Sequence, residues 1–349
     1  MSLEALDHIE RKQGRMGAMP NLDLLRSIAI TLVVVDHTIG IQGIWYLGRW
    51  KVEWIGLIGV YMFFVHTCLV LMWSLERKPH TLDFYIRRVF RIYPLAIVAI
   101  VFAVLTRAPL SGTNAIPWNL RQFIQNCLLM QNFHGVSYIA VLWSLPLEVD
   151  MYILLPVLFF FVRKNFSQWP LLLIWALAAE FCRSTMSPIS NNLVMVIPNF
   201  LPGVMAYVAF AKRRATLPAW LFPLFVALLF SLLMSFPSLK WSWVFSLALG
   251  LGLPSFKQMT GKVVKRVSHE VAKYSYGIYL AHPFGIWIGF FLLRQASLPI
   301  KILVELACSI TFAIASYHLI EKPMIRLGSR IATHAEMRYE QMEYAKSDA

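Results

Sequence analysis

Apolar residues gather along the chain into long runs that alternate with short basic, aromatic or proline-containing stretches. A helix needs about 20 predominantly apolar residues to cross a bilayer, and most of these runs approach that length. The pattern therefore predicts an all-α, polytopic membrane protein with about ten transmembrane helices. The predicted spans are residues 21–40, 54–73, 92–107, 141–162, 169–183, 195–211, 218–236, 241–256, 274–293 and 299–320.

Residues 110–140 do not fit this pattern. The apolar run from Phe123 to Phe133 is too short to cross a bilayer, and Asn126, Gln131 and Asn132 interrupt it. Irregular backbone at membrane depth is tolerated where it lies against protein or lines a cavity. We therefore predict a re-entrant or interfacial segment that lines a cavity.

The basic residues orient the predicted bundle. If the N-terminus is cytoplasmic, 24 of the 32 Lys and Arg residues fall in the cytoplasmic segments. Cytoplasmic loops carry such an excess in membrane proteins, so we predict that both termini are cytoplasmic. The predicted parts are a cytoplasmic N-terminal tail (1–19), a transmembrane domain (20–326) and a cytoplasmic C-terminal tail (327–349).

Composition supports a membrane protein and argues against nucleic-acid binding. The chain is 58% hydrophobic and only 14% charged, whereas soluble domains have about 25% charged residues. The net charge of +14 is explained by the topological bias of Lys and Arg. The four cysteines lie in or beside apolar runs without metal-ligand spacing, so we expect neither a metal nor a bound cofactor.

The first span carries ionisable residues, which are costly inside a membrane. Asp23, Arg26 and His37 lie on one helical face, and the eleven-residue step from Arg26 to His37 is about 16 Å along the axis. Such a stripe is expected to face a polar cavity. The alternative is that the acid and the guanidinium lie at the cytoplasmic interface and His37 near the opposite one.

The fourth span places Trp143, Ser144 and Glu148 in its outer half, at the depth of His37. A carboxylate next to an imidazole fixes its tautomer and raises its basicity for proton abstraction. We therefore predict that Glu148 pairs with His37. Alternatively, Glu148 pairs with a buried arginine or caps a broken helix.

Three arginines cluster between the second and third spans. Arg87, Arg88 and Arg91 are spaced i,i+3 and i,i+4, so their guanidinium groups converge at the cytoplasmic mouth if the segment is helical. Arginine suits bidentate phosphate binding. The alternative is a purely topological role. His66, His282, Glu305 and His318 are weaker signals, because single intramembrane polar groups are commonly satisfied by contacts within the bundle.

Several short motifs lie along the chain in a fixed order and spacing. They are Leu22-Asp23-x-Leu25-Arg26 followed by ten residues and His37, Gly56-x-x-Gly59-Val60, Phe63-Phe64, Arg87-Arg88-x-x-Arg91-Ile92-x-Pro94, Asn132-Phe133, Trp143-Ser144-Leu145 with Glu148, Tyr152 with Pro156, Ser275-Tyr276-x-Ile278-Tyr279-Leu280-x-His282, and Glu321-x-Pro323. Together these motifs resemble the membrane acyltransferase-3 family, the bacterial O-acyltransferases of surface glycans, over roughly residues 18 to 326. One departure is His66-Thr67, which stands where relatives often have Ser-Gly after the Phe-Phe pair.

The resemblance implies a bacterial inner-membrane enzyme that moves an acyl group, most simply acetyl, from cytoplasmic acyl-CoA to a hydroxyl of an extracytoplasmic glycan or glycosylated metabolite. By resemblance His37 is the catalytic histidine and Arg26 its partner, and we add Glu148 to this catalytic set. Arg87, Arg88 and Arg91 would bind the donor. The residues expected to line the cavity or contact the acceptor are Asp23, Trp143, Ser144, Tyr279 and His282. Among these, Ser144 is expected to donate to the developing oxyanion. Since the chain ends soon after the tenth span, the acceptor is expected to be delivered by the bundle or a partner.

Two other functions fit a polar cavity in a membrane bundle. A secondary transporter or flippase for a glycan or glycolipid would show paired broken helices in repeated halves, and the sequence shows no such repeat. A non-enzymatic scaffold or sensor would use the charged stripe only to position its helices.

Overall fold

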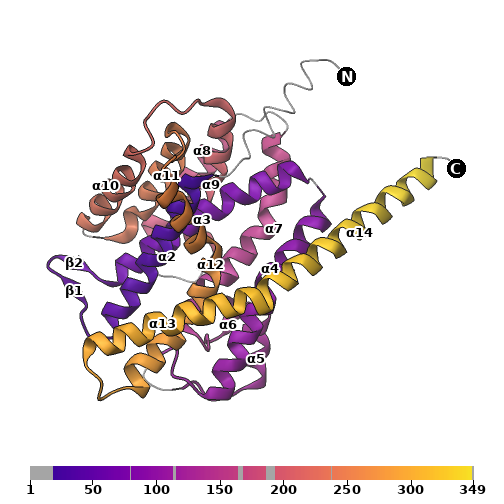
Figure 1. Ribbon diagram of the computed structural model, residues 1–349. Coiled ribbons are helices and arrows are strands. Elements are labelled where there is room, and N and C mark those ends of the chain that lie inside the picture. The colour runs from indigo at the N-terminus through magenta and orange to yellow at the C-terminus, as the bar shows by residue number, and fades with distance from the viewer. Residues whose placement is uncertain are drawn as a thin grey trace.

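The computed structural model describes residues 19–78, 80–112, 115–163, 168–185, 193–236 and 238–347. The predicted cytoplasmic tail 1–19 lies outside these residues except for Met19. The long helices are α2 (Pro20–Gly40), α3 (Glu53–Arg77), α4 (Thr81–Thr106), α7 (Ser144–Arg163), α8 (Gln168–Thr185), α9 (Leu193–Lys212), α10 (Leu221–Ser235), α11 (Ser242–Gly252), α12 (Lys262–Ile286), α13 (Leu298–Ser316) and α14 (Lys322–Ser347) (Figure 1).

These helices confirm the all-α prediction. In the described part of the chain, five helical segments are long and apolar enough to cross a membrane, which indicates a multi-pass membrane protein. The count of ten spans and the orientation of the termini stay predictions. The five segments are Glu53–Arg77, Thr81–Thr106, Ala140–Arg163, Val194–Lys212 and Leu298–Met337.

Helix α3 is the central helix of the bundle, with most of its side chains buried. It packs against α2, α9 and α11, and glycines permit the closest approaches. A Cβ atom on Gly59 would lie 2.5 Å from the Ala29 carbonyl oxygen of α2, and one on Gly203 of α9 would lie 2.3 Å from the Val65 carbonyl oxygen. The apolar core thereby fixes the position of α2, which carries the polar stripe.

Helix α4 begins earlier than predicted. The expected third span starts at residue 92, whereas α4 starts at Thr81 and continues past Pro94. The apolar run starts only at Ile92, but an i,i+4 ion pair between Arg87 and Asp83 stabilises the preceding turns. The arginines predicted at a mouth therefore project from a continuous helix.

Residues 110–140 contain only short helices in their described part. These are α5 (Leu120–Cys127) and α6 (Gln131–His134), followed by a 3₁₀ turn at Ala140–Trp143. None is long enough to cross a bilayer, as the sequence predicted for this stretch. Helix α5 packs against α4 (Figure 1).

The C-terminal part departs from a simple tail. Helix α13 passes through a π-helical segment, Tyr317–Glu321, into α14, which packs against α4 and then extends beyond the bundle (Figure 1). A second π-helical segment, Trp287–Leu292, ends α12. The remaining described elements are the hairpin β1 (Tyr46–Leu47) and β2 (Trp50–Lys51) and two further 3₁₀ turns, Leu239–Trp241 and Leu253–Ser255.

Candidate active site

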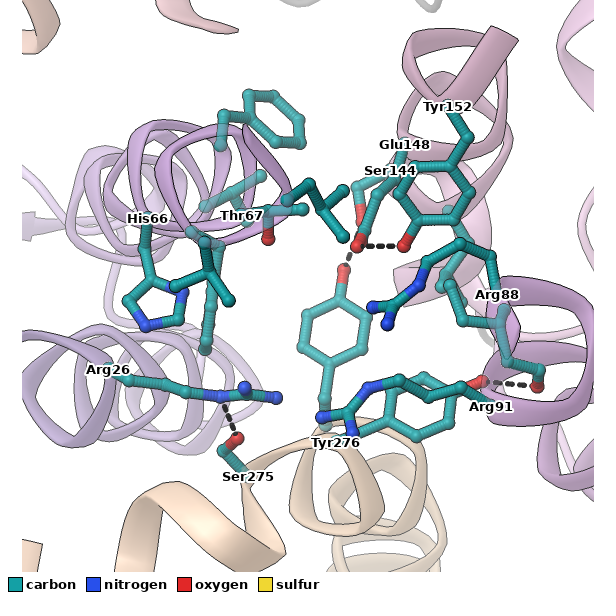
Figure 2. Close-up of a pocket in the computed structure, with 18 residues that line it drawn as sticks. Arg26, His66, Thr67, Arg88, Arg91, Ser144, Glu148, Tyr152, Ser275 and Tyr276 are labelled. Carbon is teal, nitrogen blue, oxygen red and sulfur yellow. Dashed lines mark hydrogen bonds between the residues drawn. The ribbon is translucent and has the colours of Figure 1, made fainter. Parts of the chain in front are cut away.

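A cavity of about 220 Å³ lies inside the bundle between α2, α3, α4, α7 and α12, and we call it the central cavity (Figure 2). Its polar lining combines charged groups and hydroxyls in a setting of aromatic and aliphatic side chains. The polar and aromatic lining residues are Arg26, Phe63, Phe64, His66, Thr67, Arg88, Arg91, Ser144, Glu148, Tyr152, Ser275, Tyr276 and Tyr279.

Three guanidinium groups converge on the central cavity from two helices. Arg26 enters from α2, and its Nε donates to the Ser275 hydroxyl oxygen over 2.5 Å. Arg88 and Arg91 enter from α4 on the other side (Figure 2). The Nε of Arg88 is buried and has no hydrogen-bond partner, and Arg26 and Arg91 are close enough to repel each other. The arrangement is therefore short of negative charge.

A second and wider pocket of about 640 Å³ adjoins the central cavity, and we call it the basic pocket. Arg26, His66, Val70 and Arg91 line both, so the two spaces lie on either side of shared side chains. The basic pocket lies where α2 begins. Its other charged or titratable residues are Asp23, Arg77, His269, Lys273 and Glu321.

Acidic residues in the basic pocket only partly balance its positive charge. Asp23 Oδ2 lies 3.0 Å from His269 Nδ1. Glu321 is buried, its Oε1 has no hydrogen-bond partner, and the charges of Arg26 and Arg91 act on it. Neither carboxylate forms an ion pair with a lysine or arginine in the described part of the chain.

The tyrosine and serine hydroxyls of the central cavity have their hydrogens committed. Tyr279 donates to the Val141 carbonyl oxygen over 2.6 Å, so the Ser144 hydroxyl, 2.7 Å away, donates to the Tyr279 oxygen. Tyr276 donates to the Ile92 carbonyl oxygen. In this arrangement Ser144 has no hydrogen for the oxyanion role expected from the sequence, and the cavity's uncommitted donors include the guanidinium groups.

Glu148 lies away from its predicted partner. Its Oε1 accepts a hydrogen bond of 2.5 Å from the Tyr152 hydroxyl, and its charge acts on Arg26 and Arg88. No hydrogen bond or ion pair joins Glu148 to His37 among the described residues. The predicted pairing is therefore not found among the described residues. The alternative predicted from the sequence, a partnership with a buried arginine, is closer to the geometry, because the half-buried Glu148 acts on Arg26 and Arg88.

His37 lies near the C-terminal end of α2 and lines neither the central cavity nor the basic pocket. Its Nδ1 is 2.8 Å from the Val33 carbonyl oxygen. Because a carbonyl oxygen can only accept, Nδ1 carries the hydrogen and Nε2 of the neutral ring keeps its lone pair. The ring centroid of His282, on α12, is 5.0 Å from that of His37. The Val33 carbonyl oxygen thus fixes the tautomer of His37, the role that was predicted for Glu148 from the sequence.

The structure separates the other predicted residues. Arg87 does not line the central cavity, because it binds Asp83 and donates to Ser329 of α14 over 3.0 Å. Asp23 lines the basic pocket, and the partly buried Trp143 packs on the core instead of lining the cavity. Ser144 and Tyr279 line the cavity. The roles of all these residues stay predictions.

Sequence reasoning gave no role to several residues that line these spaces. Ser275 and Tyr276 line the cavity beside Tyr279, which the sequence had marked, and this i, i+1, i+4 pattern of polar groups on α12 was a usable signal for the other two. Glu321 is placed by a π-helical segment, which commonly marks functional sites. Its position was not readable from helical periodicity. Among the described residues no group of three or more His, Cys, Asp or Glu is placed to hold a metal ion.

Comparison with known proteins gives one match. A family model described as an acyltransferase domain matches residues 19–318, whereas no curated protein and no solved structure matches the chain. The matched region includes every helix that encloses the central cavity and confirms the family predicted from the sequence. The chain therefore belongs to the membrane acyltransferase-3 family and is an enzyme that transfers acyl groups other than aminoacyl groups.

Proposed function

We propose that this enzyme is an O-acyltransferase that moves an acetyl group from cytoplasmic acetyl-CoA to a hydroxyl of an envelope glycan or a glycosylated metabolite outside the bacterial inner membrane. The observation that carries the proposal is the convergence of Arg26, Arg88 and Arg91 on one cavity, where Glu148 is the only acidic side chain among the described lining residues. Excess positive charge in a poorly solvated space is costly unless an anion compensates it. A multivalent anion such as coenzyme A meets that need.

The sizes and charges of the basic pocket and the adjoining central cavity support coenzyme A as the donor. The basic pocket is about three times as large as the central cavity and adds Arg77 and Lys273 to the shared arginines. The nucleotide and its phosphates would occupy the basic pocket, and the narrow pantetheine arm would extend through the central cavity. Guanidinium groups are well suited to phosphate oxygens because they form bidentate hydrogen bonds.

In this proposal His37 takes up the proton of the acceptor hydroxyl group. Its Nε2 has the free lone pair, and Arg26 lies about 16 Å from it along α2. The acceptor oxygen attacks the thioester carbonyl carbon while its proton moves to Nε2. The carbon–sulfur bond then breaks, and the leaving thiolate takes the proton from the imidazolium. His37 is thereby restored, and no external proton or oxidant is consumed.

Sided membrane vesicles test the proposal. Inverted vesicles that contain the enzyme are given acetyl-CoA labelled in the acetyl group, and label is followed into the extracted glycan and glycolipid fractions. We expect labelling that exceeds that of vesicles without the enzyme, and none when the same donor is added to right-side-out vesicles. Equal donor consumption with and without the enzyme would refute acetyl transfer. Labelling of right-side-out vesicles alone would refute the cytoplasmic donor site.

A further inference from the structure

A separate pocket of about 330 Å³ lies at the end of α4 opposite Arg91, and we call it the Arg107 pocket. The sixteen residues from Arg91 to Arg107 correspond to about 24 Å of helix. Val104 and Arg107 contribute from the end of α4, Ile116, Pro117 and Trp118 from the following loop, and Tyr138 from beyond α6. Its volume falls in the range of small-molecule sites, about 300–1,000 Å³.

The walls of the Arg107 pocket are held by hydrogen bonds. The Tyr138 hydroxyl accepts from the Asn119 backbone nitrogen over 3.1 Å and donates to the Asn119 carbonyl oxygen over 3.3 Å. The fully buried Asn126 accepts from the Tyr138 backbone nitrogen over 3.0 Å. Ser111 donates to the Ser137 carbonyl oxygen. The pocket is therefore formed before any ligand arrives.

Arg107 is a cation without an acidic partner. It adopts the left-handed conformation, with φ 50° and ψ 34°, where α4 ends. Few residues other than glycine adopt this conformation, and those that do often lie at functional sites. No ion pair joins Arg107 to a carboxylate in the part of the chain that the structure describes. An anionic group of a ligand would compensate the charge.

Trp118 is an exposed aromatic residue that lines the same pocket. The residue is 63% exposed although it lines a concave surface. The face of an indole ring is electron-rich, and the C–H groups on one side of a sugar ring carry partial positive charge. A pocket with one aromatic face and one guanidinium group matches a sugar that carries an acidic substituent.

The Arg107 pocket lies at the His37 end of the bundle. Phe102, which directly precedes the pocket-lining Ala103 on α4, packs against Phe284 of α12 with ring centroids 5.2 Å apart. His282, two residues earlier on α12, contacts His37. This chain of contacts brings the end of α4 to the reacting end of α2, whereas the basic pocket lies where α2 begins.

We propose that the Arg107 pocket binds an acidic sugar unit of the acceptor, with the sugar ring on Trp118 and its carboxylate or phosphate on Arg107. The proposal rests on the proposed function, which places the acceptor outside the cell. The competing ligand is the headgroup of an anionic lipid, because Trp and Arg also anchor proteins at membrane interfaces. Anionic lipids concentrate in the cytoplasmic leaflet, opposite to the predicted side of Arg107, and this favours the saccharide.

The test measures saccharide binding without any donor. The full chain in phosphatidylcholine nanodiscs is titrated with a tetramer of glucuronic acid and, separately, with the neutral tetramer of glucose. Trp118→Ala removes the ring, and Arg107→Asn removes the charge with a residue that tolerates the left-handed conformation. The controls are Trp45→Ala, which replaces a tryptophan that is 62% exposed, and Arg121→Asn, which replaces an exposed arginine; neither residue lines the pocket.

We expect the acidic tetramer to bind the native protein more tightly than the neutral one. Each pocket variant should weaken binding about tenfold or more, as loss of a charged hydrogen bond or a stacked ring implies, and the controls should bind like the native protein. Thermal unfolding verifies that each variant is folded. If Arg107→Asn does not fold, the binding measured for Trp118→Ala decides the test.

Three results would overturn the proposal. The first is failure of the native protein to bind the acidic tetramer, and the second is unchanged binding in folded pocket variants. The third is that the folded pocket variants bind the saccharide like the native protein but retain less bound phosphatidylglycerol than it does, which would identify a lipid site. Donor turnover is measured separately. A native protein that binds the acidic tetramer through this pocket but transfers no acetyl group would keep this site and refute the proposed function alone.

Discussion

The rings of His37 and His282 lie edge to face, with centroids 5.0 Å apart and an interplanar angle of 64°. Each ring places Nδ1 against a backbone carbonyl oxygen four residues earlier, Val33 for His37 and Ile278 for His282. Both rings are thereby fixed in the tautomer whose Nε2 accepts hydrogen bonds. The Nε2 of His282 is buried and has no hydrogen-bond partner. It can therefore accept a hydrogen bond next to His37, the residue that is expected to become positively charged during transfer.

His282→Phe is predicted to slow acyl transfer without weakening the binding of acetyl-CoA. Phenylalanine keeps the ring contact with His37 but removes the free Nε2. A hydrogen bond to a charged group contributes about 1.5–3 kcal/mol, so we expect kcat to fall by about tenfold to a hundredfold with an unchanged KM for acetyl-CoA. His282→Ala, which also leaves a hole, separates this effect from packing. A His282→Phe enzyme with native kcat would show that His282 only fills space.

His37→Ala is predicted to give a folded, membrane-inserted protein without transfer activity. The side chain is about one-third exposed, and its Nδ1 hydrogen bond is local to α2, so its loss should cost little stability. His37→Gln serves as the conservative check, because the amide is polar but cannot take up a proton at neutral pH. Substantial acetyl transfer by either variant, measured with labelled acetyl-CoA, would remove His37 from the catalytic role.

The sequence was sufficient for the coarse fold and for the helix that carries the polar stripe. Hydropathy located the long helices because burial in lipid demands apolar length, and the polar spacing on α2 marked Arg26 for a cavity. It misplaced the start of α4, because hydropathy registers apolar residues and does not register the Asp83–Arg87 pair that extends the helix. A side-chain ion pair is a finer signal than a run of apolar residues.

Partners between helices were harder to predict. Membrane depth placed His37 and Glu148 in one layer, but depth does not fix the rotation of a helix about its axis. In the structure the rotation of α7 directs Glu148 to the arginines, and Tyr152, one turn further along the same helix, donates to it. The Ser275 contact of Arg26 spans 249 residues of sequence, and no local pattern predicts a pairing over such a distance.

Arg88→Lys and Arg91→Lys are each predicted to weaken binding of acetyl-CoA, whereas Arg87→Lys should leave it nearly unchanged. All three keep the positive charge that orients the membrane segment, but lysine lacks the planar fork of arginine. Only Arg88 and Arg91 line the cavity, and Arg87 is occupied by Asp83 and Ser329. We expect about tenfold weaker binding for each cavity variant. If all three variants bind acetyl-CoA with the affinity of the native protein, measured by calorimetry in nanodiscs, the arginines do not bind the donor and serve only to orient the membrane segment.

Glu148→Gln and His37→Ala are predicted to act independently on donor binding and turnover. Glu148 lies with the arginines of the central cavity, and no contact joins it to His37 among the described residues. Effects of groups that share no partners add, so Glu148→Gln should change the dissociation constant of acetyl-CoA by the same factor with or without His37. Tyr152→Phe should instead be non-additive with Glu148→Gln, because the two side chains share a 2.5 Å hydrogen bond. Strong non-additivity between His37 and Glu148 would restore the catalytic pair expected from the sequence.

Glu305→Gln is predicted to preserve folding and most activity, whereas Glu305→Ala should not. The Thr38 hydroxyl, one residue beyond His37, is 2.8 Å from the Val34 carbonyl oxygen and 2.5 Å from Glu305 Oε1 of α13. One hydroxyl hydrogen cannot serve both acceptors, so the contacts are satisfied if Glu305 is protonated and donates to the threonine oxygen. A neutral acid also avoids the cost of a charge at this buried position.

An amide reproduces that donor, so we expect transfer by Glu305→Gln within about threefold of the native rate and a similar unfolding temperature. Glu305→Ala leaves a cavity and frees the α2 turn that carries His37, and such truncations commonly cost about 2–5 kcal/mol. Thr38→Val is the matched control from the other side, since it removes the same hydrogen bond and keeps the volume. A folded Glu305→Gln protein without activity would show that the carboxyl group itself exchanges a proton during transfer.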